Sequence, residues 1–548
     1  MTATPPPADL IADILDQCTR SPEAPALEQG GRSLTYAELG DAVRATAARL
    51  TAEGLEPGER VLFSVRPRLE GLTLALGVVA AGGSLVLVDP GSAPELFAAR
   101  VRLAGPHWAA TESLLHLLSL PVVARVARRR GLLLPRFADL SVRHLHAGPW
   151  LPGVPRGSVR PVPGRRGRRA SRAGRASRAG RAAPAAVVER APGQEALIVF
   201  TSGTTASPRA VVHTRGSLGE GTRLLDQVAA GTPGGRVHTA QMLLGLPALV
   251  SGATWSLPDR PPGEDPAAFA RGLVGASSSF LVPADVTTLL DHLEGRPGGP
   301  EGHQAGEAPR VVLVGGAPVT PRLLERAQRV WPRTRWVGVY GMTEVLPVAA
   351  VEAAEKLSSH EGDLVGRPLA GIVARVDAPG ADGVGELVLA GPSLMRGYLG
   401  QPAEPEHRTG DRARWDVQGR LVLAGRTKDM IIRRLTNIYP ALFEPALGRL
   451  PGVAEALLVG VPRGVDGDEV VVLVVVPEDR PESESAELLQ RDPDLARRLR
   501  PLLPGVLDHT ALPDHVLRAS TIPTTGRSRK PDRARLAAAA AGLLGLTG

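Results

Sequence analysis

The hydrophobic positions of this chain fall into short runs separated by turns rich in Gly and Pro. The runs at residues 61–63, 196–200 and 470–476 are continuous and of strand length, which is typical of strands buried on both faces. Over residues 1–125 such runs alternate with stretches of helical length. This alternation predicts an α/β fold whose sheets are largely parallel and covered by helices.

The longest apolar stretch covers residues 71–88, a length at which a membrane span becomes conceivable. Gly82 and Gly83 interrupt it, and the charged residues Arg66, Arg68 and Glu70 come shortly before it. A break of this kind divides the stretch into a helix and a following strand. We therefore predict a buried helix–strand unit and no membrane span.

A cluster of small residues follows the run at 196–200 and precedes a second apolar run. Short side chains let backbone N–H groups and hydroxyls approach phosphate oxygens, and Arg209 adds a positive charge. The same composition also suits an ordinary turn, and the Walker pattern G-x-x-x-x-G-K-[ST] is absent from this loop. The cluster consists of Thr201, Ser202, Gly203, Thr204 and Thr205.

Three later stretches combine small residues with an aromatic ring or a carboxylate. Glycines after a strand let a flat ligand approach its end. A carboxylate can hold a hard cation or accept hydrogen bonds from hydroxyl groups. Each stretch could also be a plain turn. The stretches are Gly315, Gly316 and Ala317, then Tyr340, Gly341, Met342, Thr343 and Glu344, and then Thr409, Gly410 and Asp411.

Taken in this order, the stretches resemble the motifs of the adenylate-forming superfamily, which includes acyl-CoA synthetases, fatty acyl-AMP ligases and the adenylation domains of peptide synthetases. The small cluster with Pro208 and Arg209 resembles that family's T-S-G-T-T-x-x-P-[KR] phosphate loop. Residues 340–344 match Y-G-x-T-E in full, and residues 425–429 resemble its G-R-x-[DK]-D boundary. The resemblance implies ATP and Mg²⁺ as cofactors and CoA as the second substrate.

The resemblance also implies a role for each matched residue. Residues 201–205 and Arg209 would bind the phosphates, and Glu344 would bind the metal as well as serve catalysis. The other implied roles are the adenine and acyl pocket for Gly315, Gly316 and Ala317, the adenine for Tyr340 beside Gly341, the α-phosphate for Thr343, the ribose hydroxyls for Asp411, and ribose or phosphate for Arg426.

The C-terminal tail holds the candidate for a catalytic cation. Residues 523–533 resemble the family's P-x-T-x-x-G-K-x-x-R, whose Lys reaches the substrate carboxylate and the α-phosphate. A cation there would bring two anions together and offset the charge that develops between them. Alignment on K-x-D-R selects Lys530, which we prefer, and alignment on T-x-G-[KR] selects Arg527.

The resemblance also sets the expected domains. Residues 1–427 would form a large AMP-binding domain of mixed and parallel sheets layered with helices. Residues 428–548 would form a small, mobile α+β domain that starts at a hinge, Lys428. Where the family commonly has Gly-Gly in this domain, the chain has Arg434 and Leu435. The larger side chains of these two residues weigh against CoA as the acceptor.

Positive charge is concentrated in one segment. Ten Arg and no acidic residue lie between residues 156 and 181, so the rest of the chain would carry about −2 of the total +8. Low-complexity sequence of this kind cannot bury a core, and we interpret residues from about 150 to 190 as a disordered insertion. A basic run can also bind nucleic acid or anionic lipid. Nucleic acid is not the expected partner, because no aromatic residue is interleaved for base stacking.

The cysteine content and the N-terminus indicate a compartment. Cys18 is the single cysteine of the sequence, which excludes an internal disulfide framework and a Cys-based metal cluster. The first residues lack the basic and apolar regions of a signal peptide. Both features predict a cytoplasmic protein.

The expected reaction converts a carboxylic acid, fatty or β-hydroxy fatty, to acyl-AMP with release of pyrophosphate and then transfers the acyl group to CoA. One alternative rests on residues 343–348, whose T-E-x-L-P-[VI] pattern resembles the olefin-pathway branch that closes a β-lactone without a thiol. Another is a non-catalytic relative that binds nucleotide or acyl groups. Ala206 and Arg209, where the family usually has Gly and Lys, favour that alternative.

Overall fold

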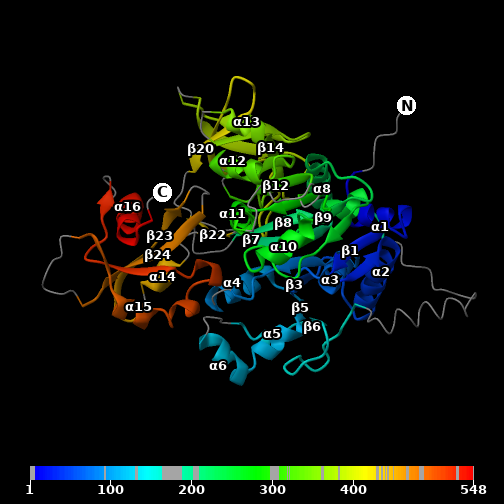
Figure 1. Cartoon of the computed structure of the whole chain (residues 1–548). Helices are drawn as coiled ribbons and strands as arrows, with labels where there is room; N and C mark the ends of the chain where they lie inside the picture. The colour runs from blue at the N-terminus through cyan, green and yellow to red at the C-terminus, as the bar shows by residue number, and fades with distance from the viewer. Residues whose placement is uncertain are drawn as a thin grey trace, which may run out of the picture.

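A computed structural model gives the structure of the chain (Figure 1). The C-terminal elements, orange to red in Figure 1, gather into a smaller unit beside a large body. The structure describes residues 7–91, 94–129, 134–162, 188–201, 209–295, 308–317, 319, 321–359, 363–380, 383–426, 431–433, 436–438, 440, 443–448, 450–464, 468–479, 487–525 and 530–546.

The first sheet of the large body has seven strands, and five neighbouring strands in it are parallel. In spatial order the strands are β18 (Gly397–Tyr398), β8 (Arg209–Thr214), β7 (Glu195–Thr201), β4 (Ser84–Leu87), β3 (Arg60–Ser64), β5 (Trp108–Glu112) and β6 (Arg143–Ala147). The helices between them are α3 (Leu69–Ala80), α4 (Pro94–Ala104), α5 (Ser113–Leu118), α6 (Pro121–Arg129) and the short η1 (Phe137–Asp139). The predicted alternation of strands and helices is confirmed.

The apolar stretch at residues 71–88 divides as predicted into α3 and β4, with the break at Gly82. Gly82 has φ +95°, a backbone conformation that favours glycine. The helix is apolar on nearly all sides because it is buried on nearly all sides. Within the described residues, no helix combines the length and apolarity that crossing a membrane requires.

The second sheet has 13 strands, and it joins segments from the start, middle and later part of the chain. Six neighbouring strands, β1, β10, β9, β11, β12 and β13, are parallel, so their carboxyl ends lie at one edge. In spatial order the strands are β16 (Val373–Asp377), β17 (Gly385–Ala390), β19 (His407–Trp415), β20 (Leu421–Arg426), β15 (Asp363–Pro368), β14 (Val345–Glu352), β13 (Arg335–Met342), β12 (Val311–Gly315), β11 (Ser278–Leu281), β9 (Arg236–His238), β10 (Thr254–Ser256), β1 (Pro25–Gln29) and β2 (Arg32–Thr35).

Local sequence signals set where the helices of the large body begin. Thr35 caps one helix in a reciprocal pair with Glu38, and Thr214 caps another with Ser217. Several further helices have Pro in their first turn, where its missing N–H has no partner to lose. The helices are α1 (Leu10–Arg20), α2 (Tyr36–Ala52), α8 (Arg215–Ala229), α9 (Leu246–Ser251), α10 (Pro266–Leu273), α11 (Pro283–Glu294), α12 (Pro321–Val330) and α13 (Ala353–Leu357).

The smaller unit is built on a four-stranded sheet whose central strand is covered on both faces. Along that strand Val471, Leu473 and Val475 face one apolar cluster, and the alternate residues at 470, 472, 474 and 476 face another. The continuous valine run follows from this double burial. The elements are β21 (Ile431–Arg433), β22 (Thr436–Ile438), α14 (Glu444–Leu447), β23 (Val453–Arg463), β24 (Asp468–Pro477), β25 (Leu489–Arg491), α15 (Pro493–Leu499), η4 (Leu503–Gly505), η5 (His509–Ala511), β26 (His515–Ala519), β27 (Thr524–Thr525), β28 (Lys530–Pro531) and α16 (Arg533–Leu544).

The smaller unit meets the large body at α4. Arg100 of α4 and Asp508 of the smaller unit form an ion pair at 3.5 Å, and both side chains are buried. Beside them the backbone N–H of His509 donates to the carbonyl of Gly91 at 3.1 Å. The guanidinium of Arg100 also lies over the ring of Phe200, 5.6 Å from its centroid. One side chain of α4 therefore contacts both the smaller unit and the strand that leads to the predicted phosphate loop.

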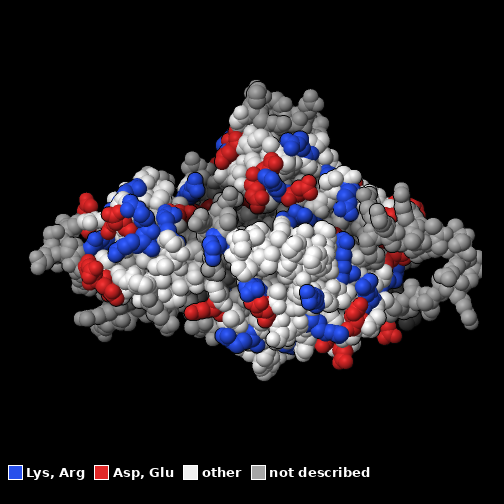
Figure 2. All heavy atoms as spheres, turned by 90° about the horizontal axis from the view of Figure 1, so that it is seen from below, with Lys and Arg blue, Asp and Glu red and all other residues white. Residues whose placement is uncertain are grey.

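The Arg-rich segment is only partly described. Residues 150–162 follow β6, where Val154 and Val162 are buried and Val159 bridges to Leu145. Residues 163–187, which hold most of the Arg run, lie outside the described residues. On the described part of the face in Figure 2, Lys and Arg side chains are interspersed with Asp and Glu.

Candidate active site

A β-hairpin frames the predicted phosphate loop. β7 and β8 pair antiparallel, and Thr201 stands opposite Arg209 at the open end. Ala196 and Ile198 are fully buried in β7, which explains the apolar run before the loop. The loop itself, including Ser202, Gly203, Thr204 and Thr205, lies outside the described residues.

Two parallel strands place the next predicted residues side by side. β12 and β13 pair with Gly315 opposite Val339, so Gly316 and Tyr340 each follow at the carboxyl end. A Cβ on Gly315 would stand 2.5 Å from the carbonyl oxygen of Val339, and Gly316 has φ +84°. Glycine is therefore required for close packing at one position and for backbone conformation at the next. Ala317 follows directly.

Tyr340 and Asp411 meet, although 71 residues separate them in the chain. The hydroxyl of Tyr340 donates to Oδ2 of Asp411 at 2.7 Å, and Asp411 is 3% exposed. Asp411 stands opposite Arg426 on the paired strands β19 and β20. Tyr340 of β13 and Asp411 of β19 thus meet through their side chains. The backbone of Arg426 on β20 lies beside Asp411, and the Arg426 side chain is outside the described atoms.

Thr343 and Glu344 form the two-residue turn between β13 and β14, whose strands close at Met342 and Val345. The turn is held through both of its carbonyl groups. His213 of β8 donates from Nε2 to the Thr343 carbonyl at 2.7 Å, and the N–H of Met395 donates to the Glu344 carbonyl at 2.8 Å. Burial lowers the pKa of His213, which favours the neutral ring that makes this contact. A Cβ on Gly341 would stand 2.7 Å from Cδ1 of Leu346, so the Leu346 side chain would have to shift to admit it.

A third contact joins the phosphate-loop hairpin to this turn. The hydroxyl of Tyr398 donates to Oε1 of Glu344 at 3.0 Å. Its ring faces the guanidinium of Arg209, with Cζ 5.2 Å from the ring centroid. Arg209 and Glu344, the predicted phosphate cation and metal ligand, therefore both contact one tyrosine.

The surroundings of Glu344 fit a hard cation that takes most of its oxygen ligands from bound phosphate groups. Among the described residues, Tyr398 donates to Oε1 of Glu344 and no side chain donates to Oε2, which suits a carboxylate shared with a metal. No group of three or more His, Cys, Asp or Glu side chains that could hold a metal occurs among those residues. A single protein carboxylate with phosphate oxygens is how Mg²⁺ is often held.

The tail places Lys530 in a short hairpin. β27 and β28 pair with Thr525 opposite Lys530. The side chain of Lys530 and all of Arg527 lie outside the described atoms, as does Lys428. The choice between Lys530 and Arg527 therefore stays a prediction, and so does the hinge.

The sequence alone did not identify two residues of the site, Tyr398 and His213. Tyr398 lies in the stretch at 396–398, which matches the family only as part of the motif order, and His213 follows the second apolar run. Both depend on pairing that residue spacing does not reveal, since Tyr398 stands opposite Val211 on an edge strand. The alternation of side chains along β8 could have indicated His213, because it places His213 on the same face of the strand as Arg209.

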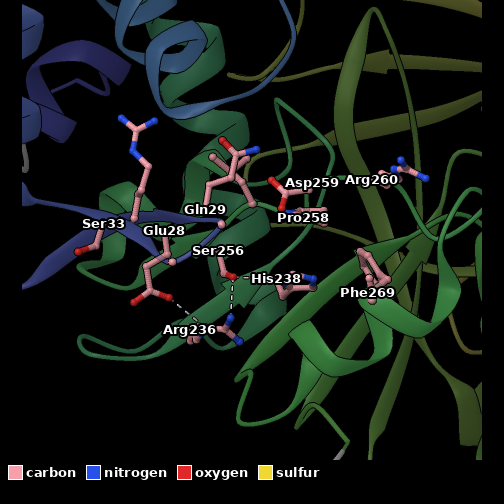
Figure 3. Close-up of a pocket in the computed structure, with 15 residues that line it drawn as sticks. Glu28, Gln29, Ser33, Arg236, His238, Ser256, Pro258, Asp259, Arg260 and Phe269 are labelled. Atoms are coloured by element: carbon pink, nitrogen blue, oxygen red, sulfur yellow. Dashed lines mark hydrogen bonds and ion pairs between the residues drawn. The ribbon is translucent and has the colours of Figure 1, made fainter. Parts of the chain in front are cut away.

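A separate cavity of about 450 Å³ lies near the other end of the 13-stranded sheet (Figure 3). Arg236 lies between Glu28 and Ser256 there, and Ser256 also contacts Nδ1 of His238 at 3.0 Å. Burial and the neighbouring Arg236 lower the pKa of His238 to about 3. None of the predicted site residues lines this cavity, so it is distinct from the site described above.

Comparison with known proteins identifies the family. The AMP-binding enzyme family model matches residues 14–399, and the model of the AMP-binding enzyme C-terminal domain matches residues 442–529. The chain belongs to the AMP-binding enzyme family. The adenylate-forming superfamily indicated by the motifs and its fold of two α/β parts are thereby confirmed.

The relatives of this AMP-binding enzyme differ in the product they are named for. Phosphinothricin tripeptide synthetase PhsC of Streptomyces viridochromogenes is 29% identical over 91% of the chain, but the chain spans only 44% of its length. Olefin beta-lactone synthetase of Stenotrophomonas maltophilia is 28% identical over 86% of the chain and 88% of its own length. A solved malonyl-CoA ligase, with methylmalonyl-CoA and AMP bound, is 25% identical with a TM-score of 0.68, covering 91% of the chain and 97% of its own.

Proposed function

We propose that this AMP-binding enzyme activates a carboxylic acid with ATP, giving an acyl-adenylate and pyrophosphate, and then transfers the acyl group to CoA. The observation that carries the proposal is the convergence of two contacts from separate parts of the chain. The contact between Tyr340 and Asp411 supports a nucleoside site, and the contacts of Tyr398 with Arg209 and Glu344 support a phosphate site beside it.

In the proposed site each residue binds or orients one part of ATP. The Tyr340 ring lies against the adenine beside Gly315, Gly316 and Ala317, and Asp411 accepts hydrogen bonds from the ribose hydroxyls with Arg426 opposite it. Arg209 and the loop at 201–205 bind the phosphates, and Thr343 lies near the α-phosphate. Mg²⁺ on Glu344 would offset phosphate charge when bound.

The substrate carboxylate attacks the α-phosphorus, and pyrophosphate leaves. Because both reactants are anions, the site works by holding them in line and by offsetting charge. Lys530 of the small domain, residues 428–548, is the proposed cation between carboxylate and α-phosphate. Rotation of this domain about Lys428 would bring up the acceptor thiol, which attacks the acyl carbonyl and displaces AMP. We propose a fatty or β-hydroxy fatty acid as the substrate class.

A second candidate function is β-lactone formation from a β-hydroxy acid. The run from Thr343 to Val348 favours it, as does the olefin beta-lactone synthetase that the chain matches over most of its length. Arg434 and Leu435, in place of the family's glycines, weaken the case for CoA. The two candidates share the adenylation step and differ in the acceptor.

The test is acid-dependent pyrophosphate release from Mg·ATP across short, long and β-hydroxy acids, first without CoA and then with it. Release with a preferred acid, and a thioester product when CoA is present, would support the acid–CoA ligase. Release with a β-hydroxy acid and a lactone product would select the alternative. No release with any of the acids, despite ATP binding, would favour a non-catalytic nucleotide-binding relative.

A further inference from the structure

Tyr398 connects the two charged residues of the phosphate region. Its hydroxyl contacts Oε1 of Glu344 at 3.0 Å, and its ring face carries the guanidinium of Arg209. The hydroxyl donates to Glu344, because both oxygens of an ionised carboxylate are acceptors.

The fold fixes this tyrosine before any ligand arrives. β18 pairs with β8 so that Tyr398 stands opposite Val211, and the side chain is 7% exposed. Its ring packs edge-on to His407, with centroids 6.2 Å apart. Gly397 permits the turn into this strand at φ +151°, where a Cβ would stand 2.9 Å from the carbonyl of Pro402.

An arginine and a glutamate this near to one tyrosine would be expected to pair with each other. Yet over the described residues no ion pair joins Arg209 to Glu344, while Tyr398 contacts both. A direct pair would engage the guanidinium that phosphate needs and the carboxylate that a metal needs. Tyr398 keeps each of them oriented and available.

We infer that Tyr398 is a positioning residue for the Mg·ATP site: it holds Glu344 for the metal and Arg209 for the phosphates and keeps the two from pairing. The inference rests on the proposed function. It predicts that loss of the hydroxyl alone acts chiefly through Glu344 and that loss of the whole ring also releases Arg209.

The experiment is calorimetric titration of ATP into the full chain with and without Mg²⁺. Tyr398→Phe keeps the ring and removes the contact with Glu344. We expect the gain in ATP affinity that Mg²⁺ gives to fall about tenfold, the size of a lost hydrogen bond to a charged group, while metal-free ATP affinity falls less than in Tyr398→Leu. Tyr398→Leu should also weaken metal-free ATP binding.

Two further variants separate positioning from general destabilisation. Tyr36→Phe removes another buried hydroxyl, one that lies 2.9 and 2.7 Å from the carbonyls of Ala248 and Ala253, and it should lower the melting temperature but leave the Mg²⁺ effect intact. Glu344→Gln should remove the Mg²⁺ effect, and adding Tyr398→Phe to it should cost nothing more.

The outcomes distinguish the inference from the function on which it rests. Wild-type chain that does not bind ATP would overturn the proposed function. Wild-type chain that binds ATP more tightly with Mg²⁺, together with an unchanged Mg²⁺ effect in Tyr398→Phe, would overturn the inference alone. Additive losses in the double variant would also overturn it, because the hydroxyl would then act independently of Glu344.

Discussion

At the scale of single residues, the site depends on carboxylates whose partners are tyrosines. Asp411 and Glu344 each accept a hydrogen bond from a phenol, Tyr340 in one case and Tyr398 in the other. A phenol donor leaves the carboxylate its full charge and its remaining lone pairs. Both carboxylates therefore keep capacity for a ligand while their orientation is fixed.

Asp411→Asn should raise the KM for ATP by about ten- to a hundredfold, since a charged acceptor for two hydroxyls becomes a neutral group with one acceptor oxygen. Tyr340→Phe should have a smaller effect, because the ring remains. Acid-dependent pyrophosphate release measures both. The control is Asp377→Asn, which alters an exposed ion pair with Arg375 and should leave the KM unchanged. Equal effects in the two Asp variants would contradict the ribose assignment.

Buried histidines should make the protein sensitive to acid. Burial lowers the pKa of His116 to about 4 and that of His238 to about 3, against an ordinary 6.5. The pKa of His144 is also lowered, mainly by burial. These rings are neutral in the fold and take up protons on unfolding, so their stabilising effect is complete above pH 6.5 and is lost as the pH falls toward 4.

His116 gives the sharpest test of this acid sensitivity. Urea unfolding between pH 7 and pH 5 should show a falling free energy of unfolding, by up to about 1.4 kcal/mol per pH unit for each proton taken up. His116→Phe should reduce that slope, since neither ring nitrogen has a hydrogen-bond partner in the described part of the chain. The exposed His107→Phe is the control. A slope unchanged by His116→Phe would contradict the prediction.

At the scale of elements, the site depends on how closely β12 and β13 approach. Gly315→Ala should separate them, because the new Cβ would stand 2.5 Å from the backbone carbonyl of Val339, which cannot move aside as a side chain can. We expect a destabilisation of about 1–3 kcal/mol and a larger KM for ATP. Gly505→Ala, with nothing within 4 Å, is the control for both readouts. An unchanged melting temperature of Gly315→Ala would contradict the prediction, because it would show that the two strands can separate without loss of stability.

The elements also show what residue patterns can and cannot predict. The runs that form β3, β7 and β24 and the division of residues 71–88 follow from the local apolar pattern. Partners distant in sequence do not. Nothing local indicates that β1 pairs with β10, or that the two-residue β18 pairs with β8 and brings Tyr398 to Glu344. Such contacts are set by the packing of whole sheets, where many registers share the same alternation.

At the scale of the whole molecule, a buried ion pair contributes to holding the smaller unit on the large body. Arg100→Met leaves the buried carboxylate of Asp508 without its guanidinium, a change that costs about 3–5 kcal/mol in comparable sites. We expect the smaller unit to leave its position on α4, seen as a larger radius of gyration in solution scattering. Arg497→Met, which breaks an exposed pair with Asp494, should leave the radius as it is. An unchanged radius in Arg100→Met would show that other contacts suffice.

The pairing of β1 with β10 has a consequence for synthesis. Leu27 stands opposite Trp255, and Thr254 donates to the carbonyl of Pro25, 229 residues earlier in the chain. As the polypeptide leaves the ribosome, the β1–β2 hairpin must therefore wait for more than 200 further residues before its open edge finds a partner. Until then it presents unpaired N–H and C=O groups to other nascent chains. Early protection of that edge, by a chaperone or by slow local collapse, is a requirement that this sheet order imposes on the cell.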